Sequence, residues 1–268
     1  MSRVIVSLSV VFGIFCLSSF KLVDDERNSL AKTPEIAASE AVASVCDQQL
    51  FEYFYTSSER FKLYCDSAYK SLFTEQNRPT RKVFDFAMKG YAYCLSQNLL
   101  SRSEILTFID YSLSSNKKRM WVLDLKQMKV VFHELVAHGR NSGLEFAKKF
   151  SNTTNSFQSS LGFFVTGEIY DGKHNTSIKM NGIEKKFNGK ALDRGIVIHG
   201  ADYVSEDFIR SNQRLGRSLG CPAVSEDVIS DLSSTIAGGT CIFSYFPNKT
   251  YLKTSRILNS DVVFSRSL

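Results

Sequence analysis

The feature that most restricts the fold is a series of short apolar runs that begins at Ile105 and continues through the second half of the chain. The runs are separated by polar or glycine-containing segments, and most are rich in the valine, isoleucine and phenylalanine that favour β-strands. We predict strands at 105–111, 120–125, 129–138, 161–170, 176–180, 196–199 and 241–246. Many short strands with few helices between them predict a β-rich domain, a sandwich or a barrel-like sheet, over residues 103–250.

The segments between the predicted strands contain turn signals. Residues 124–127 are expected to join two strands as a hairpin, and Asp171-Gly172 and Asn181-Gly182 are typical of hairpin turns. One short amphipathic helix is predicted at 225–237, because Ser225 can cap its first turn and Gly238-Gly239 can end it.

Before residue 103 the apolar periodicity is helical. Between residues 35 and 76 apolar side chains recur at steps of three and four, which predicts two helices with a break around residues 56–58. A third helix is expected to start at Pro79 or Thr80. We interpret this region as a helical extension without chemistry of its own.

The first twenty residues have the pattern of an export signal. Arg3 supplies the positive start, and residues 4–20 are apolar. A cleaved signal and an uncleaved anchor both fit, whereas a lipoprotein signal at Cys16 is disfavoured by the bulky Phe15 before it. We expect the body of the protein in the periplasm or cell envelope, with membrane contact only through this segment if it is not cleaved.

The predicted organisation is that of an α+β chain in five parts. They are a signal peptide or anchor at 1–20, a polar linker at 21–34, a helical N-terminal region at 35–102, the β-rich domain at 103–250 and a C-terminal tail at 251–268.

Composition and charge exclude some classes of protein. Hydrophobic residues make up 43% of the chain and charged residues 22%, so wholesale disorder is excluded. The formal net charge of +6 is spread over short groups such as Lys117-Lys118-Arg119. Scattered charge of this kind is typical of a solvated face, so nucleic-acid binding is not expected, although a basic surface would suit an anionic polymer.

The cysteines and histidines do not form a metal motif. No CxxC pair or Cys/His cluster has the spacing of a zinc site, and His133 and His138 are five residues apart rather than the four of a zinc-protease helix. Outside the cytoplasm one disulfide is expected among Cys46, Cys65 and Cys94, with the pairing left open.

The candidate chemistry lies between residues 194 and 224. An apolar run ends on His199-Gly200, and a glycine-flanked turn after it carries Cys221 followed by Pro222. A free thiol titrates near 8.5, so a working nucleophile needs a neighbouring base such as an imidazole. We therefore predict that Cys221 and His199 form a thiolate–imidazole pair, and the helix start at Ser225 would further favour the thiolate.

Other residues of this stretch are candidates for supporting roles. The carbonyl of Gly200 can orient the imidazole, and the amides of Leu219, Gly220 and Cys221 can stabilise an oxyanion. Ser218 and Tyr203 can donate hydrogen bonds around the site.

These residues carry a resemblance to a known family. The run from His199-Gly200 to residues 218–221 (SLGC) resembles the signature of murein L,D-transpeptidase catalytic domains. Residues 121–125, 136–140 and 162–167 resemble one branch of that family, and the resemblance covers about residues 103–247.

The resemblance implies a β-rich fold that holds a cysteine nucleophile. Cys221 would attack the bond between meso-diaminopimelate and D-alanine in a peptidoglycan stem peptide, with His199 as the base. D-alanine leaves, and the amine of a second stem peptide takes the acyl group from the thioester to form a 3→3 cross-link. No metal or cofactor is implied.

The chain departs from the commoner family pattern at two places. Leu219 replaces a histidine before Gly-Cys, and residues 222–224 replace an aliphatic-Arg ending. A cationic anchor for a substrate carboxylate is therefore missing. The candidates for substrate contacts are Tyr203, Arg217, His138 and Lys173, with Arg194 as a further cation.

Two other functions remain open at this point. The same thioester can be hydrolysed by water, which would make the protein a carboxypeptidase or endopeptidase. The domain can also be a wall-binding module without catalysis.

Overall fold

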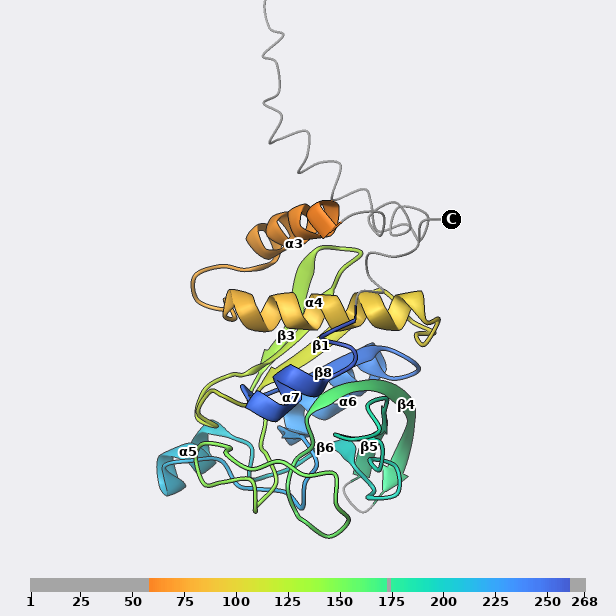
Figure 1. Cartoon of the computed structure of the whole chain (residues 1–268). Helices are drawn as coiled ribbons and strands as arrows, with labels where there is room; N and C mark the ends of the chain where they lie inside the picture. Colours follow the sequence, from red (N-terminus) through yellow and green to blue (C-terminus); the bar gives the residue numbers. More distant parts are fainter. Residues whose placement is uncertain (1–57, 173–174, 261–268) are drawn as a thin grey trace, which may run out of the picture.

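Eight strands form a single mixed sheet, with five helices around it in the part of the chain that the structure describes (Figure 1). The computed structural model describes residues 58–172 and 175–260. Along the sheet the strands follow the order β3-β2-β1-β8-β4-β5-β6-β7. The strands are β1 (Ile105–Asp110), β2 (Met120–Asp124), β3 (Lys129–Glu134), β4 (Gly162–Gly172), β5 (Asn175–Gly182), β6 (Val197–Gly200), β7 (Ala223–Val224) and β8 (Cys241–Tyr245). The helices are α3 (Ser58–Leu72), α4 (Arg81–Ser96), α5 (Glu206–Asn212), α6 (Glu226–Ile236) and α7 (Lys249–Thr254).

The two edges of this sheet are joined by the chain that follows β3. Ala137 forms a bridge with Ala223 of β7, in which the Ala137 amide donates to the Ala223 carbonyl at 2.8 Å and the Ala223 amide donates back at 3.3 Å. The sheet therefore comes close to a closed barrel. This confirms the predicted α+β fold, a β-rich barrel-like domain preceded by helices.

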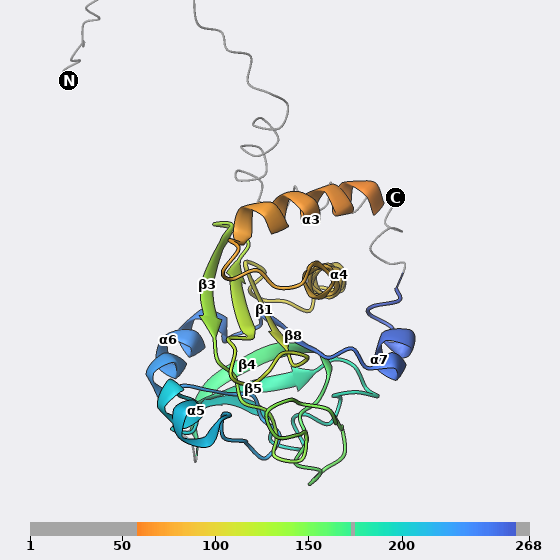
Figure 2. The ribbon, with the colours of Figure 1, turned by 90° about the vertical axis from the view of Figure 1, so that its left-hand side faces the viewer.

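Both faces of the sheet are buried, which explains why its central strands are continuous apolar runs. In β1, Leu106 and Phe108 belong to one apolar cluster, and Ile105 and Ile109 belong to the other. Helix α4 covers the first face and α6 covers the second, as Figure 2 shows with α4 seen end-on. Helix α5 lies at the end of the molecule opposite α3 (Figures 1 and 2).

Helix α4 approaches the sheet closely at Gly90. A side-chain carbon added at Gly90 would lie 1.9 Å from the Phe163 ring, and Phe163 stacks on Phe243 with ring centroids 4.2 Å apart. Because glycine has no side chain, α4 can pack this closely against the Phe163 ring of the sheet. The helix begins at Arg81, after the cap residue Thr80, whereas the predicted start was Pro79 or Thr80.

One predicted hairpin is wrong. β5 ends at Gly182, but residues 183–196 form turns before β6 returns to the sheet. Asn188 folds back on this segment: its Oδ1 accepts from the Glu184 amide at 2.8 Å, and its backbone occupies the space of a Gly182 side chain. The hairpin predicted at 171–172 is confirmed, because β4 pairs with β5 up to Gly172 and Asn175.

β3 is shorter than predicted and ends at Glu134 rather than at residue 138. The chain turns away from the ladder because the Val136 carbonyl accepts two hydrogen bonds from the buried Arg119 side chain, at 2.8 and 3.1 Å. The pattern of apolar residues continues through this bend, so it gives no sign of the strand end.

The predicted cysteine pairing is corrected in part. Cys65 and Cys94 are both buried and free, so they do not pair with each other. Cys94 lies 4.0 Å from Cys241 instead, sulfur to sulfur. Pairings that involve Cys46, and the predictions for the signal and linker, fall outside the described residues.

The predicted C-terminal tail contains α7, which packs on the sheet. Its Tyr251 hydroxyl donates to Glu184 Oε2 at 2.8 Å, and the same oxygen accepts from the Phe163 amide at 2.9 Å. Within residues 58–172 and 175–260, no helix is long and apolar enough to cross a membrane.

We predict that Gly90→Ala lowers the free energy of unfolding by about 1–3 kcal/mol, because the new methyl group overlaps the Phe163 ring. Helix propensity alone predicts the opposite sign, a stabilisation of about 1 kcal/mol. Urea unfolding followed by circular dichroism measures the change. Lys89→Ala, one residue earlier in α4, is the matched control and should stay within about 0.5 kcal/mol of wild type. A stabilised Gly90→Ala protein would contradict this account of the α4 contact.

Candidate active site

The imidazole of His199 is held at the end of β6, between two neighbouring strands. His199 pairs with Ser177 of β5 on one side and with Ala223 of β7 on the other. The pairing with β7 is parallel, and the His199 amide donates to the Pro222 carbonyl at 3.4 Å. The sheet therefore places the turn that carries Cys221 directly beside the strand that carries His199.

A backbone carbonyl fixes the tautomer of this imidazole. His199 Nδ1 lies 2.8 Å from the Gly200 carbonyl oxygen. Because a carbonyl only accepts hydrogen bonds, Nδ1 carries the proton and the lone pair of the neutral ring is on Nε2. The Gly200 carbonyl therefore contacts the imidazole, which is the position expected for it from the sequence. Gly200 also packs tightly on α6, since an added side-chain carbon would lie 2.9 Å from Ile229.

The turn that carries Cys221 is shaped by its own side chains. Ser218 Oγ donates to the Cys221 carbonyl at 2.6 Å and accepts from the Gly220 amide at 3.0 Å. Gly220 has a φ of +130°, which other residues rarely adopt, and an added side-chain carbon would lie 2.9 Å from the Gln158 carbonyl. Ser218 and Gly220 therefore both stabilise the conformation of the turn.

The turn is attached to the segment that closes the sheet. The Ser218 amide donates to the His138 carbonyl at 3.1 Å, and the Arg140 amide donates to the Ser218 carbonyl at 2.8 Å. Together with the bridge between Ala137 and Ala223, these bonds hold both ends of the turn.

The thiol of Cys221 is partly exposed and lies against the residues that lead into β6. Its Sγ is 3.6 Å from the Gly195 carbonyl oxygen. Burial raises the pKa of the Cys221 thiol, while the Val197 amide and the Arg194 charge lower it. Charge near the sulfur therefore partly offsets the effect of burial on the thiol pKa.

Arg194 is the cation that lies next to this thiol. Its Nη1 donates to the Ser151 carbonyl at 2.7 Å and to Ser160 Oγ at 2.5 Å, and its Nη2 donates to the Gln158 carbonyl at 2.6 Å. All three acceptors are neutral, and in the described ranges no carboxylate forms an ion pair with Arg194. Burial lowers the pKa of Arg194, and the thiolate form of Cys221 raises it.

The remaining predicted contact residues have different surroundings. Tyr203 is half-buried, and burial, followed by the charge of the Cys221 thiolate, raises the pKa of its phenol to about 12. The phenol is therefore neutral at neutral pH. Leu219 is 60% exposed at the tip of the turn, and Arg217 lies two residues before it. Lys173 lies outside the described residues.

His138 lies in the interior rather than on the surface, with 1% of its area exposed. Its Nδ1 accepts from Arg119 Nη2 at 2.8 Å, because an arginine only donates. Burial, followed by the charges of Arg119 and Arg217, lowers the pKa of His138 to about 3, so the ring is neutral at neutral pH.

Arg119 is a structural residue that sequence reasoning missed. In the sequence it follows Lys117 and Lys118 and looks like part of a solvated basic group. In the structure it is fully buried, and its Nη1 donates to the Leu113 carbonyl at 2.7 Å. No local signal separates it from its lysine neighbours, since its acceptors come from distant parts of the chain.

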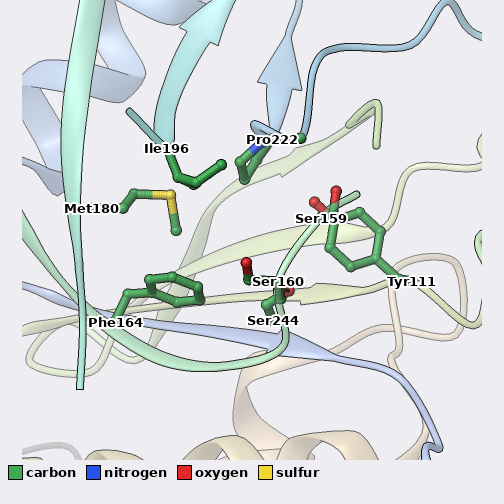
Figure 3. Close-up of a pocket in the computed structure, with 9 residues that line it drawn as sticks. Tyr111, Ser159, Ser160, Phe164, Met180, Ile196, Pro222 and Ser244 are labelled. Carbon is green, nitrogen blue, oxygen red and sulfur yellow. Dashed lines mark hydrogen bonds between the residues drawn. The ribbon is translucent and has the colours of Figure 1, made fainter. Parts of the chain in front are cut away.

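A small cavity lies behind the turn (Figure 3). It is about large enough for one water molecule, so it cannot be the substrate cleft. Its lining comes from Tyr111, Ser159, Ser160, Phe164, Met180, Ile196, Gly220, Pro222 and Ser244. The described residues contain no group of three or more His, Cys, Asp or Glu that could hold a metal ion.

Comparison with known families identifies the class of the protein. A family model described as the L,D-transpeptidase catalytic domain matches residues 75–245. This chain therefore belongs to the L,D-transpeptidase catalytic domain family. The resemblance read from residues around His199 and Cys221 is confirmed at the level of the family.

Several solved structures with low similarity to this chain are L,D-transpeptidases. The chain is similar to the L,D-transpeptidase from Mycobacterium smegmatis at 13% identity, covering 53% of this chain and 59% of that chain with a TM-score of 0.35. A second similar structure, an L,D-transpeptidase from Enterococcus faecium, shows 15% identity over 53% of this chain and 50% of that chain, with a TM-score of 0.32. The helical cell shape determining protein Pgp2 from Campylobacter jejuni shows 12% identity over 57% and 54% of the two chains, with a TM-score of 0.34.

The chain thus spans 59% and 50% of the length of the first two solved chains, and the identities are low. The family assignment rests on the match over residues 75–245. A search of curated proteins finds no match to this chain.

We predict that Arg194→Met shifts the pH midpoint of Cys221 alkylation by iodoacetamide to higher pH, because the thiolate loses its neighbouring cation. Near neutral pH the alkylation rate should fall by roughly threefold or more. Peptide mass spectrometry at Cys221 measures the rate. Arg194→Lys keeps a positive charge and should give an intermediate midpoint.

Arg210→Met is the control for this measurement, since Arg210 lies on α5 and pairs with Asp207. It should leave the midpoint unchanged. If folded Arg194→Met protein titrates like wild type, Arg194 has no electrostatic effect on the thiol.

Proposed function

We propose that this protein is an exported cysteine L,D-transpeptidase that acts on peptidoglycan stem peptides. The observation that supports this most is the parallel pairing of β6 with β7, which puts the Cys221 turn beside His199 while Gly200 fixes the imidazole tautomer. The family of the catalytic domain supports the same reaction class. The periplasm or cell envelope, where the substrate lies, is the proposed location.

In the proposed first half-reaction, His199 Nε2 takes the proton of the Cys221 thiol. The thiolate attacks the carbonyl that joins meso-diaminopimelate to D-alanine, and the resulting tetrahedral oxyanion is stabilised by backbone amides. The Gly220 amide already donates to Ser218 Oγ, so we assign the nearest oxyanion contact to the Cys221 amide. The C–N bond then breaks, D-alanine leaves with the proton from His199, and a thioester remains.

In the second half-reaction the amine of another stem peptide attacks the thioester. His199 takes a proton from this amine, the C–S bond breaks, and the thiolate leaves and is protonated again. The product is a new amide, a 3→3 cross-link or an exchanged terminal D-amino acid.

We assign supporting roles from the contacts of each residue. Ser218, Leu219 and Gly220 shape the turn, Tyr203 donates a hydrogen bond near the sulfur, and Arg217 contacts the substrate. The buried His138 is assigned a structural role instead, because its ring is bonded to Arg119. No metal or cofactor takes part in this proposal.

The same proposal covers the organisation of the chain. We keep the boundaries of the helical region at 35–102 and of the catalytic domain at 103–250 as proposals. The apolar cluster shared by α3, α4 and the sheet suggests that the helical region stabilises the catalytic domain.

We predict that a carbapenem forms a stoichiometric adduct on Cys221. The thiolate attacks the β-lactam carbonyl, the ring C–N bond opens, and the protein gains the full mass of the drug. Intact mass spectrometry measures the gain. Cys221→Ala should show no adduct, while Cys65→Ala, which removes a buried free cysteine, should react like wild type.

An unmodified wild-type protein would exclude the thioester mechanism. It would favour the alternative of a wall-binding module without catalysis, in which Cys221→Ala leaves binding to the wall unchanged.

A second alternative is hydrolysis of the same thioester by water. We predict that purified protein converts a tetrapeptide-bearing muropeptide into a cross-linked dimer with release of D-alanine, as followed by chromatography and mass spectrometry. Shortened monomer without dimer would identify an L,D-carboxypeptidase or endopeptidase. Cys221→Ala should form neither product.

A further inference from the structure

Two buried cysteines meet where helix α4 packs on the centre of the sheet. Cys94 lies on the buried face of α4, and Cys241 is the first residue of β8. Both side chains are fully buried, and the Cys241 thiol donates to the Cys94 sulfur at 4.0 Å. A single buried cysteine is commonly just a small apolar side chain, but two that meet across two elements can also form a covalent bond.

The backbone holds the two cysteines close together. The Ser101 and Arg102 amides, which follow α4, both donate to the Gly239 carbonyl, at 3.1 and 3.3 Å. Gly239 lies two residues before Cys241, in the turn that leads into β8. Cys241 itself pairs with both neighbouring strands, β1 and β4. The chain after α4 is therefore bonded to the chain before β8, so that the two thiols keep their places.

The separation of the two sulfurs is small enough to be closed by side-chain rotation. A disulfide brings two sulfur atoms to about 2 Å. From the 4.0 Å between Cys94 and Cys241, each sulfur has to move by only about 1 Å. Rotation of both side chains about their Cα–Cβ bonds can supply this movement without a shift of α4 or β8.

Two other cysteines lie away from this pair. Cys221 packs against the apolar cluster on the other face of the sheet, whereas Cys94 and Cys241 belong to the cluster that α4 covers. Burial, followed by the charge of Asp85, raises the pKa of the Cys65 thiol, so Cys65 lies near Asp85. Cys94 comes nine residues after Asp85, about 13 Å further along the helix. Oxidation of the pair can therefore leave the Cys221 thiol free.

We propose that Cys94 and Cys241 are a modification site, where thiol–disulfide exchange with an external disulfide forms a cross-link between α4 and β8. One of the two thiolates attacks the external disulfide, and one thiolate of that reagent leaves. The other cysteine thiolate attacks the resulting mixed disulfide, and the second thiolate of the reagent leaves. The two cysteines lose two electrons, which reduce the external disulfide to two thiols, and these thiols take up the two protons.

The exchange takes place before the core closes. In the folded protein Cys94 and Cys241 have no exposed area, so an external disulfide cannot reach either sulfur. The neighbouring Cys94 sulfur, followed by burial, raises the pKa of the Cys241 thiol, which reduces the amount of thiolate available for attack. We therefore expect the cross-link to form during folding, and to form slowly in protein that has already folded in the reduced state.

The test refolds full-length Cys221→Ala protein from urea in a mixture of oxidised and reduced glutathione. This substitution removes a partly exposed thiol that would compete for the oxidant. Remaining thiols are alkylated with iodoacetamide, and unreduced peptides are analysed by mass spectrometry. We expect a linked pair of peptides that contain Cys94 and Cys241, lighter than the two reduced peptides by two hydrogen atoms. Protein that is folded first and then treated should form this link at least roughly tenfold more slowly.

Thermal unfolding, followed by circular dichroism, measures what the cross-link does to stability. The linked protein should melt roughly 5 °C or more above the same protein refolded under reducing conditions, because the link restricts the unfolded chain. Cys241→Ala, made in the same background, should show no difference between the two conditions. Cys65→Ala is the matched control, since Cys65 is also buried in the cluster under α4, and it should keep both the link and the difference.

Alkylated Cys94 and Cys241 after oxidative refolding, or a link from Cys94 to any other cysteine, would overturn the inference. Equal melting temperatures of the linked and reduced proteins would exclude a stabilising cross-link, and equally fast linking of the folded protein would exclude its formation during folding. The carbapenem reaction of wild-type protein tests the proposed function separately. An adduct on Cys221 without the link leaves the transpeptidase standing and ends only the modification site, whereas a link without an adduct does the reverse.

Discussion

The position of the Cys221 turn depends on how residues 135–140 leave β3. This segment forms backbone hydrogen bonds with the turn at two points. Ala137 pairs with Ala223, and His138 and Arg140 bond to Ser218. One short stretch thereby closes the sheet and holds both ends of the turn. Because these are backbone bonds, the geometry of the turn follows from the closure of the sheet and depends little on the identity of its exposed side chains.

Arg119 supports this segment from the interior. Its side chain donates to the Val136 carbonyl and to the His138 ring, and it lies 5.1 Å from the centre of the Tyr111 ring. Burial lowers the pKa of Arg119 to about 10, so it stays charged at neutral pH. A buried charge is tolerated only when its donors are satisfied, and the Val136 carbonyl, the Leu113 carbonyl and the His138 ring accept from Arg119 here. The neutral state of His138 belongs to the same arrangement, since a second positive charge beside Arg119 would be repelled.

The architecture could be predicted because strands that are buried on both faces of the sheet have continuous apolar sequences. β1, β2 and β8 are such runs, and α4 starts at Arg81, within two residues of the predicted starts at Pro79 and Thr80. The ends of the strands could not be predicted from the local sequence. The bend after Glu134 depends on Arg119, fifteen residues earlier, and the return of the chain after Gly182 depends on Asn188. Contacts between distant residues leave no periodic signal.

The same distinction applies to the candidate site. The spacing of His199 and Cys221 predicts two strand ends and a turn, and the parallel pairing of β6 with β7 explains how that spacing brings the segments together. The charge around the sulfur could not be predicted, because Arg194 is bonded to residues 151–160, which have no sequence pattern in common with it.

Arg194 and Arg217 both donate to backbone carbonyls beside the turn, but their charges have different surroundings. The terminal nitrogens of Arg194 donate to carbonyl and hydroxyl groups of the loop at 151–160, so its charge is fixed in place beside the sulfur. Arg217 uses Nη1 for backbone carbonyls and shares its surroundings with two other cations. A fixed charge whose donors are satisfied can shift the thiol pKa but has little capacity to bind a ligand. In the proposed reaction, Arg194 would therefore act on the nucleophile, while the proton moves through His199 Nε2.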